Sequence, residues 1–182
     1  MPLAIRLISR AADFAARRHS GQARKGQSGA PYLNHLAEVA ALVAGTADGA
    51  DAELVAAAWL HDVVEDEHAT ADEVEALFGR RICGLVQELT DDMTLPKEER
   101  KRRQVEEIGA KSPGARLLKL ADKVSNVRGV NDDPPADWSA DELRSYVEWA
   151  VSVVDAGCRG IDGGLEAAFD SEVARLNSAA TG

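Results

Sequence analysis

The sequence predicts an all-α fold, a single helical bundle of about eight to ten helices. Apolar residues recur three or four positions apart along most of the chain, which is the spacing of a buried helix face. Residues that typically cap helices separate these stretches from one another. No run of alternating apolar and polar residues between turn signals indicates a strand.

Three helices are expected in the first third of the chain. The first spans residues 3–18, and its apolar stripe consists of Leu3, Leu7, Ala11, Phe14 and Ala15. A loop of small and basic residues, HSGQARKGQSGAP, separates it from a second helix over residues 32–44, which Gly45 ends. Asp51 is placed to cap a third helix, whose apolar run AELVAAAWL continues to about Glu65.

Two short helices and a charged one are expected next. Thr70 and Glu73 have the spacing of a capping box and begin a helix that ends near Gly79. Residues 80–90 continue as helix. A proline suits the first turn of the charged helix over residues 96–108.

The last part of the chain predicts three longer helices. Ser112 and the proline after it begin the helix that carries KLADKVSNV, and the segment NDDPPADW then forms a loop. Ser139 and Glu142 form a second capping box, which opens a helix to about Ala156. A final amphipathic helix spans roughly residues 164–178.

Length and composition indicate one domain. The chain has 182 residues, of which 45% are apolar and 29% are charged, and this suffices for one core. We assign residues 1–178 to the domain and residues 179–182 to a flexible tail. No apolar run approaches the roughly 20 residues that a membrane-spanning helix needs. Cys83 and Cys158 fit two buried thiols in a reducing cytoplasm better than a disulfide framework or a zinc site.

The net charge of −10 argues against nucleic acids and anionic membranes as partners. An anionic small molecule needs a metal ion or a local basic patch to overcome this overall field. The sequence does not decide between a monomer and a dimer.

The segment HDVVED, residues 61–66, gathers acidic groups at the end of the expected third helix. In a continuous helix His61 stacks over Glu65 and Asp62 over Asp66, and the two pairs lie about 100° apart. Negative charge is unfavourable at a helix C-terminus, and so is the desolvation of unpaired carboxylates. A divalent cation would remove both conflicts, and the alternative is a solvated acidic helix end.

Two other helices supply further candidate ligands. His35 lies in a mostly apolar helix, where a lone histidine is otherwise a hydrogen-bonded core residue. Asp122 lies between two apolar residues and needs a partner at that depth, and Asn126 follows one turn later on the same face. One histidine, the His61-Asp62 pair and one aspartate make a mixed nitrogen and oxygen site. Such a site suits Mn²⁺, Zn²⁺ or Fe²⁺ better than Ca²⁺ or a thiolate-selected metal.

The order H…HD…D resembles the HD superfamily of metal-dependent phosphohydrolases. Three longer segments resemble the hydrolase domain of RelA/SpoT proteins: FAARRHSGQARKGQSGAPYLNHLAEVA, AAWLHDVVEDEHATADEVEALFG and LLKLADKVSNVRGV. The segment SPGARLLKLADKVSNVRGVN followed by YVEWAVSVV is closer still to the small stand-alone members, the metazoan SpoT-homologue type. The resemblance covers nearly the whole chain.

The resemblance implies an HD domain that hydrolyses guanosine 3′,5′-bis(diphosphate), the alarmone ppGpp or pppGpp, and releases pyrophosphate from its 3′ position. It implies Mn²⁺ as the cofactor, held by His35, His61, Asp62 and Asp122. Glu65 and Asp66 match the catalytic acidic pair, and Glu65, with Asp66 beside it, is expected to orient a metal-activated water and accept its proton. The expected partner is therefore a small guanine nucleotide.

Two departures from the family pattern concern neighbours of the proposed metal ligands. Leu36 replaces a proline that often follows the first metal histidine. Lys123-Val124-Ser125 replaces the commoner Arg-Leu-His before Asn126, which itself matches the family's asparagine. Neither departure removes a proposed metal ligand, but both bear on the contacts behind the ligands and on substrate preference.

Several residues outside the metal site are candidate substrate contacts. Arg24 and Lys25 lie in a loop of Gly and Ser, where they can neutralise phosphate charge, the alternative being a solvated basic turn. Lys97 matches a phosphate contact of the resembling proteins, although most of PKEERKRR suits a solvated helix face. Tyr146 matches a substrate-side position and otherwise suits core packing, and Trp138 is a weaker candidate.

Lys119 and Lys123 are secondary candidates for phosphate contacts. His19 and His68 lie in or near loops, so we expect them to be solvated or to support neighbouring side chains.

Three functions are consistent with these features. The first is the alarmone 3′-pyrophosphohydrolase. The second is an HD phosphatase of another phosphorylated nucleotide, such as the 2′- or 3′-phosphate of a nicotinamide dinucleotide. The third is a non-catalytic nucleotide sensor, against which the intact Glu65-Asp66 pair argues, because a sensor would not need it.

Overall fold

The computed structural model describes residues 2–47 and 51–179. Within these ranges the only extended pairing is an isolated antiparallel bridge between Ala23 and Pro31, so the all-α prediction is confirmed. The helices are α1 (Pro2–Arg18), α2 (Leu33–Ala44), α3 (Ala52–Leu60), α4 (Ala71–Phe78), α5 (Arg80–Leu89), α6 (Lys97–Glu107), the 3₁₀ helix η2 (Ile108–Ala110), α7 (Pro113–Asp132), α8 (Ala140–Gly157) and α9 (Gly163–Ala179).

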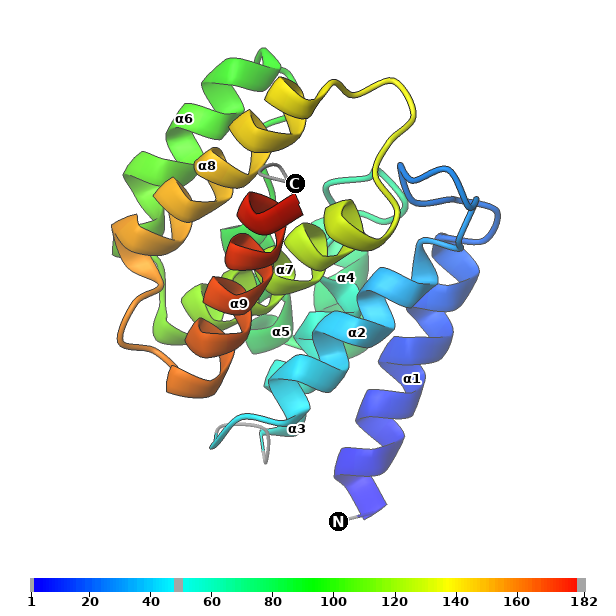
Figure 1. Ribbon diagram of the computed structural model, residues 1–182. Coiled ribbons are helices and arrows are strands. Elements are labelled where there is room, and N and C mark those ends of the chain that lie inside the picture. Colours follow the sequence, from blue (N-terminus) through cyan, green and yellow to red (C-terminus); the bar gives the residue numbers. More distant parts are fainter. Residues whose placement is uncertain (1, 48–50, 180–182) are drawn as a thin grey trace.

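Helix α7 lies at the centre of the bundle. It packs against α2, α5, α8 and α9, while α3 packs against α1, α2 and α5. In Figure 1, α6 and α8 lie side by side on one side of the molecule, and α1 and α2 lie on the other. Helices α2, α3 and α7, which carry or precede the proposed metal ligands, all contact one another.

One apolar core joins these helices. In α3 the side chains from Leu54 to Ala58 and that of Leu60 are buried, because this helix is apolar on almost every side. Helix α7 is buried along most of its length, and its buried residues include the charged Lys119, Asp122 and Lys123. Charged groups at this depth need partners of opposite charge or a cation.

Side-chain caps begin several helices as the sequence predicts. Asp51 accepts hydrogen bonds from the backbone N–H groups of the second and third residues of α3. Ser139 and Glu142 complete a capping box at the start of α8. Thr70 accepts a hydrogen bond from the N–H of Glu73, but the Glu73 carboxylate pairs with Arg18 rather than turning back to Thr70.

The predicted end of the third helix is wrong. Helix α3 ends at Leu60 rather than near Glu65, and residues 61–67 form successive turns. The N–H groups of His68 and Ala69 both bond to the Val63 carbonyl, and this closes the segment into a compact loop. The side chains of residues 61–68 therefore do not lie on two regular helical stripes.

The predicted apolar stripe of α1 is also too long at its beginning. Leu3 is 79% exposed, whereas Ala11 and Ala15 are fully buried. The N-terminal end of α1 extends beyond the neighbouring helices, so its first turn has nothing to pack against (Figure 1).

The C-terminal end of the described structure is helical. Helix α9 ends at Ala179, so the first residue of the predicted tail belongs to this helix, and residues 180–182 lie outside the described ranges. None of the described helices combines the length and the apolar character needed to cross a bilayer.

Candidate metal centre and cleft

Four predicted ligands from three parts of the chain converge at one buried point. His35 belongs to α2, Asp122 belongs to α7, and His61 and Asp62 directly follow α3. The Nε2 atom of His35 lies 3.3 Å from Asp122 Oδ1 and 3.6 Å from Asp62 Oδ2. The Nε2 atom of His61 lies 3.0 Å from Asp62 Oδ2 and 3.7 Å from Asp122 Oδ1. These spacings are those of donor atoms around a common centre.

Hydrogen bonds behind the two imidazoles orient them. The Nδ1 atom of His35 lies 2.9 Å from Ser125 Oγ, whose hydroxyl donates to Glu38. Ser125 therefore accepts the Nδ1 proton of His35. The Nδ1 atom of His61 lies 2.8 Å from the Ala58 carbonyl and donates to it. In both histidines this leaves Nε2, the atom that faces the carboxylates, free to bind a metal.

The donor set fits a divalent metal ion. His61 Nε2 is buried and has no hydrogen-bond partner within the described ranges, although two carboxylates face it. Single donor atoms of His35, His61 and Asp62 lie within 4.8 Å of one another. Two imidazole nitrogens and two carboxylate oxygens suit a first-row divalent ion, so these residues can hold one.

The pKa values of this group show how strongly its members interact. Burial opposes the charged form of His61, but the carboxylates of Asp62 and Asp122 outweigh it and raise the His61 pKa to about 10. Burial likewise opposes ionisation of Asp62, yet the imidazoles of His61 and His35 hold its pKa well below the usual range. Because metal ligation needs neutral imidazoles, a bound cation would take the place of these protons.

Two further side chains support the carboxylates. The Tyr32 hydroxyl donates to Asp62 Oδ2 over 2.5 Å, and Asn126 Nδ2 donates to Asp122 Oδ1 over 2.6 Å. Asn126 was predicted to lie on this face, whereas Tyr32 was not predicted as a site residue. The signal for Tyr32 is its position three residues before His35, close to one helical turn away.

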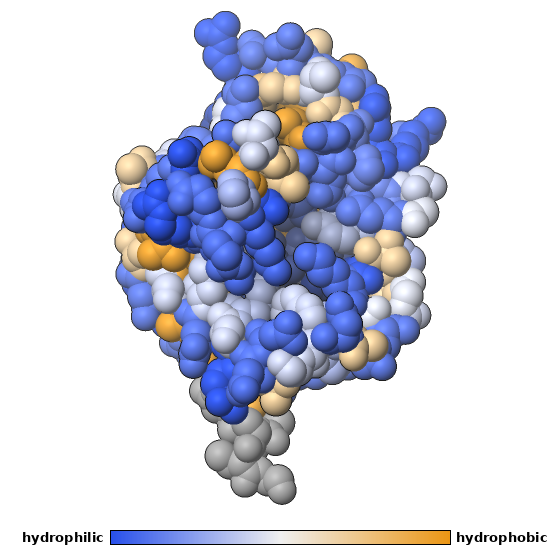
Figure 2. Space-filling model, turned by 90° about the horizontal axis from the view of Figure 1, so that it is seen from above, coloured by the Kyte–Doolittle hydropathy of each residue, from blue (hydrophilic) through white to orange (hydrophobic). Residues whose placement is uncertain are grey.

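A cleft of about 550 Å³ opens over this centre, within the usual range for small-molecule sites. In Figure 2, which views the molecule from above, this face is hollowed and mostly hydrophilic. Eight basic and seven acidic residues line the cleft, so it does not share the strongly negative balance of the chain. The basic residues are Arg24, Lys25, Lys97, Arg100, Lys101, Lys119, Lys123 and Arg128.

Comparisons with known proteins agree with this arrangement. A family model described as an HD domain matches residues 11–146, which hold all four proposed ligands. The chain belongs to the HD-domain family.

Among its relatives is the guanosine-3′,5′-bis(diphosphate) 3′-pyrophosphohydrolase MESH1 of Homo sapiens. It is 50% identical over 159 residues, which cover 87% of this chain and 88% of the human protein. The MESH1 protein of Drosophila melanogaster is 43% identical over 158 residues, which cover 87% of this chain and 88% of the fly protein. This chain is thus also a member of the MESH1 group within the HD-domain family.

Solved structures show the same fold. A structure described as a metazoan orthologue of SpoT that hydrolyses ppGpp superposes with a TM-score of 0.87 at 38% identity, covering 93% of this chain and 94% of the other. A Listeria monocytogenes protein, lmo0812, superposes with a TM-score of 0.63 at 26% identity, covering 81% of this chain and 96% of the other.

The structure separates the two residues predicted to form the catalytic acidic pair of this HD domain. Glu65 lines the cleft, and its Oε2 atom accepts a hydrogen bond of 3.0 Å from the backbone N–H of Asp91. Burial, and secondly the charge of Asp62, raise the pKa of Glu65 above its usual value. A carboxylate with a raised pKa beside a metal site suits a general base.

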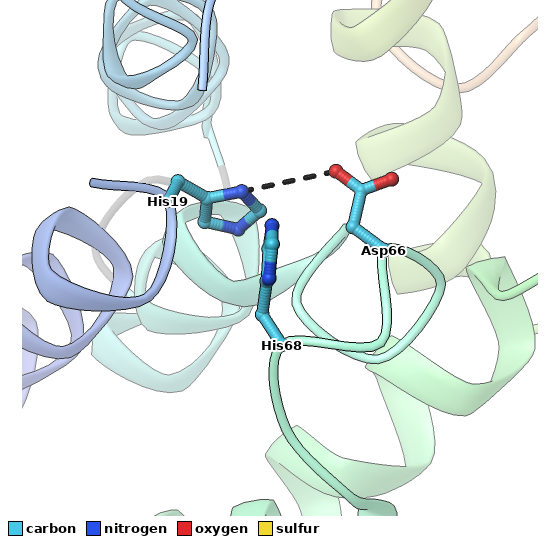
Figure 3. Close-up of side chains that lie close together, drawn as sticks. All are labelled: His19, Asp66 and His68. Carbon is cyan, nitrogen blue, oxygen red and sulfur yellow. Dashed lines mark ion pairs between the residues drawn. The ribbon is translucent and has the colours of Figure 1, made fainter. Parts of the chain in front are cut away.

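Asp66 lies outside the cleft lining. Its Oδ2 atom accepts a hydrogen bond of 2.8 Å from Gln22 Nε2, and it faces His19 and His68 rather than the cleft (Figure 3). The prediction that Asp66 shares the cleft face with Asp62 is wrong: the Asp66 N–H still bonds to the Asp62 carbonyl, but the Asp66 carboxylate is held by Gln22 and does not line the cleft.

The predicted phosphate contacts lie around the cleft. Arg24 Nη2 donates to the Ser125 carbonyl over 3.2 Å, so its guanidinium lies against α7. Lys25 and Lys97 are exposed residues of the cleft lining. The loop that carries Arg24 is held by Asp133, whose Oδ1 atom accepts a hydrogen bond of 2.9 Å from the N–H of Gln27.

Two lysines of α7 are buried in the cleft lining. Lys119 is 7% exposed and Lys123 is 3% exposed, and both line the cleft. Both were predicted only as secondary candidates for phosphate contacts, and they lie three residues before and one residue after Asp122. The Lys123 ammonium lies 3.5 Å from Asp122 Oδ2 and 4.1 Å from the centre of the Trp149 ring.

Three aromatic residues form one wall of the cleft. The Tyr146 ring centre lies 5.2 Å from that of Trp138 and 5.5 Å from that of Trp149. All three residues line the cleft, among them Tyr146 and Trp138, the two aromatic residues predicted as candidate substrate contacts. Burial raises the pKa of the Tyr146 hydroxyl, which therefore stays protonated and can donate a hydrogen bond.

Proposed function

We propose that this protein is a metal-dependent hydrolase that releases pyrophosphate from the 3′ position of guanosine 3′,5′-bis(diphosphate). The observation that carries the proposal is the position of the His35, His61, Asp62 and Asp122 cluster under a cleft with both basic and aromatic walls. The names of the MESH1 relatives support the same activity. The products are GDP or GTP and pyrophosphate.

Each class of residue around the cleft has a proposed role. A divalent ion held by the four ligands, Mn²⁺ in our proposal, would polarise a phosphoryl oxygen and lower the pKa of a water molecule. Glu65 takes the proton of the attacking water. The basic residues of the cleft neutralise phosphate charge that increases toward the transition state.

The hydrolysis is a single displacement at the phosphorus that carries the 3′ oxygen. The oxygen of the water forms a bond to the phosphorus that carries the 3′ oxygen, and the bond between that phosphorus and the 3′ oxygen breaks. The pyrophosphate leaves with the new oxygen, and the 3′ oxygen takes up a proton. Glu65 returns it, because its carboxyl holds the proton taken from the water.

The charge distribution allows a polyanion to enter. The chain carries a net charge of −10, which would repel a nucleotide with two diphosphate groups. In the cleft, Lys119, Lys123 and Arg24 bring positive charge close to the metal ligands. The aromatic wall, with Tyr146 at its centre, offers a surface on which a nucleobase can stack.

We include a cytoplasmic location in the proposal. Cys83 and Cys158 are both buried free thiols, as a reducing compartment permits.

The test compares two substrates with the purified, Mn²⁺-loaded protein. We expect pyrophosphate release from ppGpp to be faster than orthophosphate release from a nicotinamide dinucleotide 2′-phosphate. The reverse ranking would assign the protein to the second class, an HD phosphatase of another nucleotide. Binding of ppGpp without turnover in the metal-loaded protein would instead make it a nucleotide sensor.

A further inference from the structure

A second group of potential metal ligands lies outside the His35 centre. It consists of His19, which follows α1, and of Asp66 and His68 in the loop after α3 (Figure 3). One donor atom from each lies within 4.8 Å of the other two. The His19 and His68 rings are 4.6 Å apart and meet edge to face, and His19 Nδ1 lies 3.8 Å from Asp66 Oδ2.

A fourth polar side chain, Gln22, lies between these three. Its Oε1 atom is 2.6 Å from His19 Nδ1 and 3.0 Å from His68 Nε2. Its Nε2 atom donates to Asp66 Oδ2 over 2.8 Å. Gln22 thus touches every member of the group and offers a carbonyl oxygen to a cation.

We propose that His19, Asp66 and His68 form a second metal site, for a Zn²⁺-like transition-metal ion, with Gln22 Oε1 as a fourth donor. Two imidazole nitrogens, one carboxylate oxygen and one amide oxygen make a four-coordinate set. In a tetrahedral site with bonds of about 2.0–2.1 Å, neighbouring donor atoms are about 3.3 Å apart. Three of the donor separations, 2.6, 3.0 and 3.8 Å, bracket this value.

The burial of His19 distinguishes this group from an ordinary surface cluster. His19 is 3% exposed, so of the two expected environments, solvated or supporting neighbouring side chains, the structure excludes the first. The atom that it directs toward Asp66 and Gln22 is Nδ1, so this buried imidazole presents a nitrogen donor to the group. Burial also lowers the pKa of His19, which favours the neutral imidazole that a metal requires.

The site would hold the loop that carries Asp62 and Glu65. Asp66 and His68 flank Glu67, a non-glycine residue in the left-handed region with φ 58°. This conformation is costly and persists only where the surroundings hold it. Tyr32 stacks on His19 at 5.3 Å and donates to Asp62, so the second site touches the first through one side chain.

The test counts metal ions in the absence of substrate, so its outcome is separate from that of the proposed activity. Metal-free protein is titrated with Zn²⁺, and bound metal is measured by mass spectrometry after gel filtration. We expect two ions per chain for the unchanged protein. His68→Asn should retain one ion, because the amide keeps polar contacts but removes an imidazole nitrogen.

A matched variant separates the two sites. His35→Asn should also retain one ion, and in this background Zn²⁺ should still raise the melting temperature. The double variant His35→Asn/His68→Asn should lose that shift. If His68→Asn folds poorly by circular dichroism, His19→Gln takes its place. This variant should also retain one ion. One ion per chain in the unchanged protein, or two in both His68→Asn and His19→Gln, would overturn the proposal.

Discussion

Ser125 lies directly behind His35, with its Oγ atom 2.9 Å from the imidazole Nδ1. The two residues are far apart in the sequence, and the contact forms because α2 packs on α7. Ser125 also donates to Glu38 Oε2 over 2.6 Å, and Glu38 in turn pairs with Arg128. The serine that departs from the family pattern therefore takes part in orienting a proposed metal ligand.

Replacing Ser125 should weaken the metal centre without unfolding the protein. Ser125→Ala removes the acceptor of the His35 Nδ1 proton, so the ring loses the bond that fixes its orientation. We expect metal affinity to fall by roughly 10- to 100-fold, as for other groups behind metal ligands. Competition with a chromophoric chelator measures this change.

Ser152→Ala is the matched control. The Ser152 hydroxyl lies on the exposed side of α8 and donates to the carbonyl of Glu148. Ser152→Ala should leave metal affinity unchanged. Equal affinities for Ser125→Ala and Ser152→Ala would show that Ser125 does not orient the ligand.

Replacing Glu65 should separate metal binding from turnover. Glu65→Gln keeps the shape and the hydrogen bond from the Asp91 N–H but cannot accept a proton. We expect kcat for ppGpp to fall by about 10²- to 10⁴-fold, with metal content unchanged. Glu67→Gln, two residues away and exposed, should keep full activity. If Glu65→Gln turns over at the normal rate, another group handles the proton.

The sequence predicts the helices well, and the four candidate ligands that it singles out lie together in the structure, because both predictions depend on local features. Asp51 and Ser139 are recognisable caps, and both act as caps in the structure. His35 and Asp122 are polar residues within apolar helical stretches, so burial and the need for a partner follow from their neighbours.

The course of the chain after Leu60 depends on distant contacts and could not be predicted in this way. The run of apolar and acidic residues continues the helical pattern, yet Asp66 bonds to Gln22, which lies 44 positions earlier in the chain. The depth of Lys119 and Lys123 has a similar cause. Lys123 packs over Trp149 of α8, and Lys119 lies near the charges of Glu65 and Asp91, all of them distant in the sequence.

Gly129 should control the position of Arg24. A Cβ atom at Gly129 would lie 2.5 Å from Arg24 Nη2, so Gly129→Ala displaces the mobile end of this arginine and not the backbone. Loss of one hydrogen bond to a charged group, roughly 1.5–3 kcal/mol, should raise the KM for ppGpp by about 10- to 100-fold. Steady-state kinetics on the metal-loaded protein measures the effect.

Gly84→Ala is the control for this helical substitution. A Cβ atom at Gly84, inside α5, meets nothing within 4 Å. Alanine in place of this glycine should stabilise the helix by up to about 1 kcal/mol and leave KM unchanged. If both variants have the KM of the unchanged protein, Arg24 does not contribute to substrate binding.

Gly157 should be required for the close packing of α8 on η2. A Cβ atom there would lie 2.6 Å from the backbone nitrogen of Gly109 and 2.8 Å from its Cα atom. Since these are backbone atoms, Gly157→Ala must push the two segments apart, at a cost of typically 1–3 kcal/mol for overpacking. Chains of this size lose about 2–4 °C of melting temperature per kcal/mol, so calorimetry should show a clear decrease. Gly163→Ala, where the added atom meets nothing within 4 Å, should melt at or above the normal temperature. Equal melting temperatures for Gly157→Ala and Gly163→Ala would mean that the contact relaxes without cost. In that case α8 is not held to η2 by this pair of glycines.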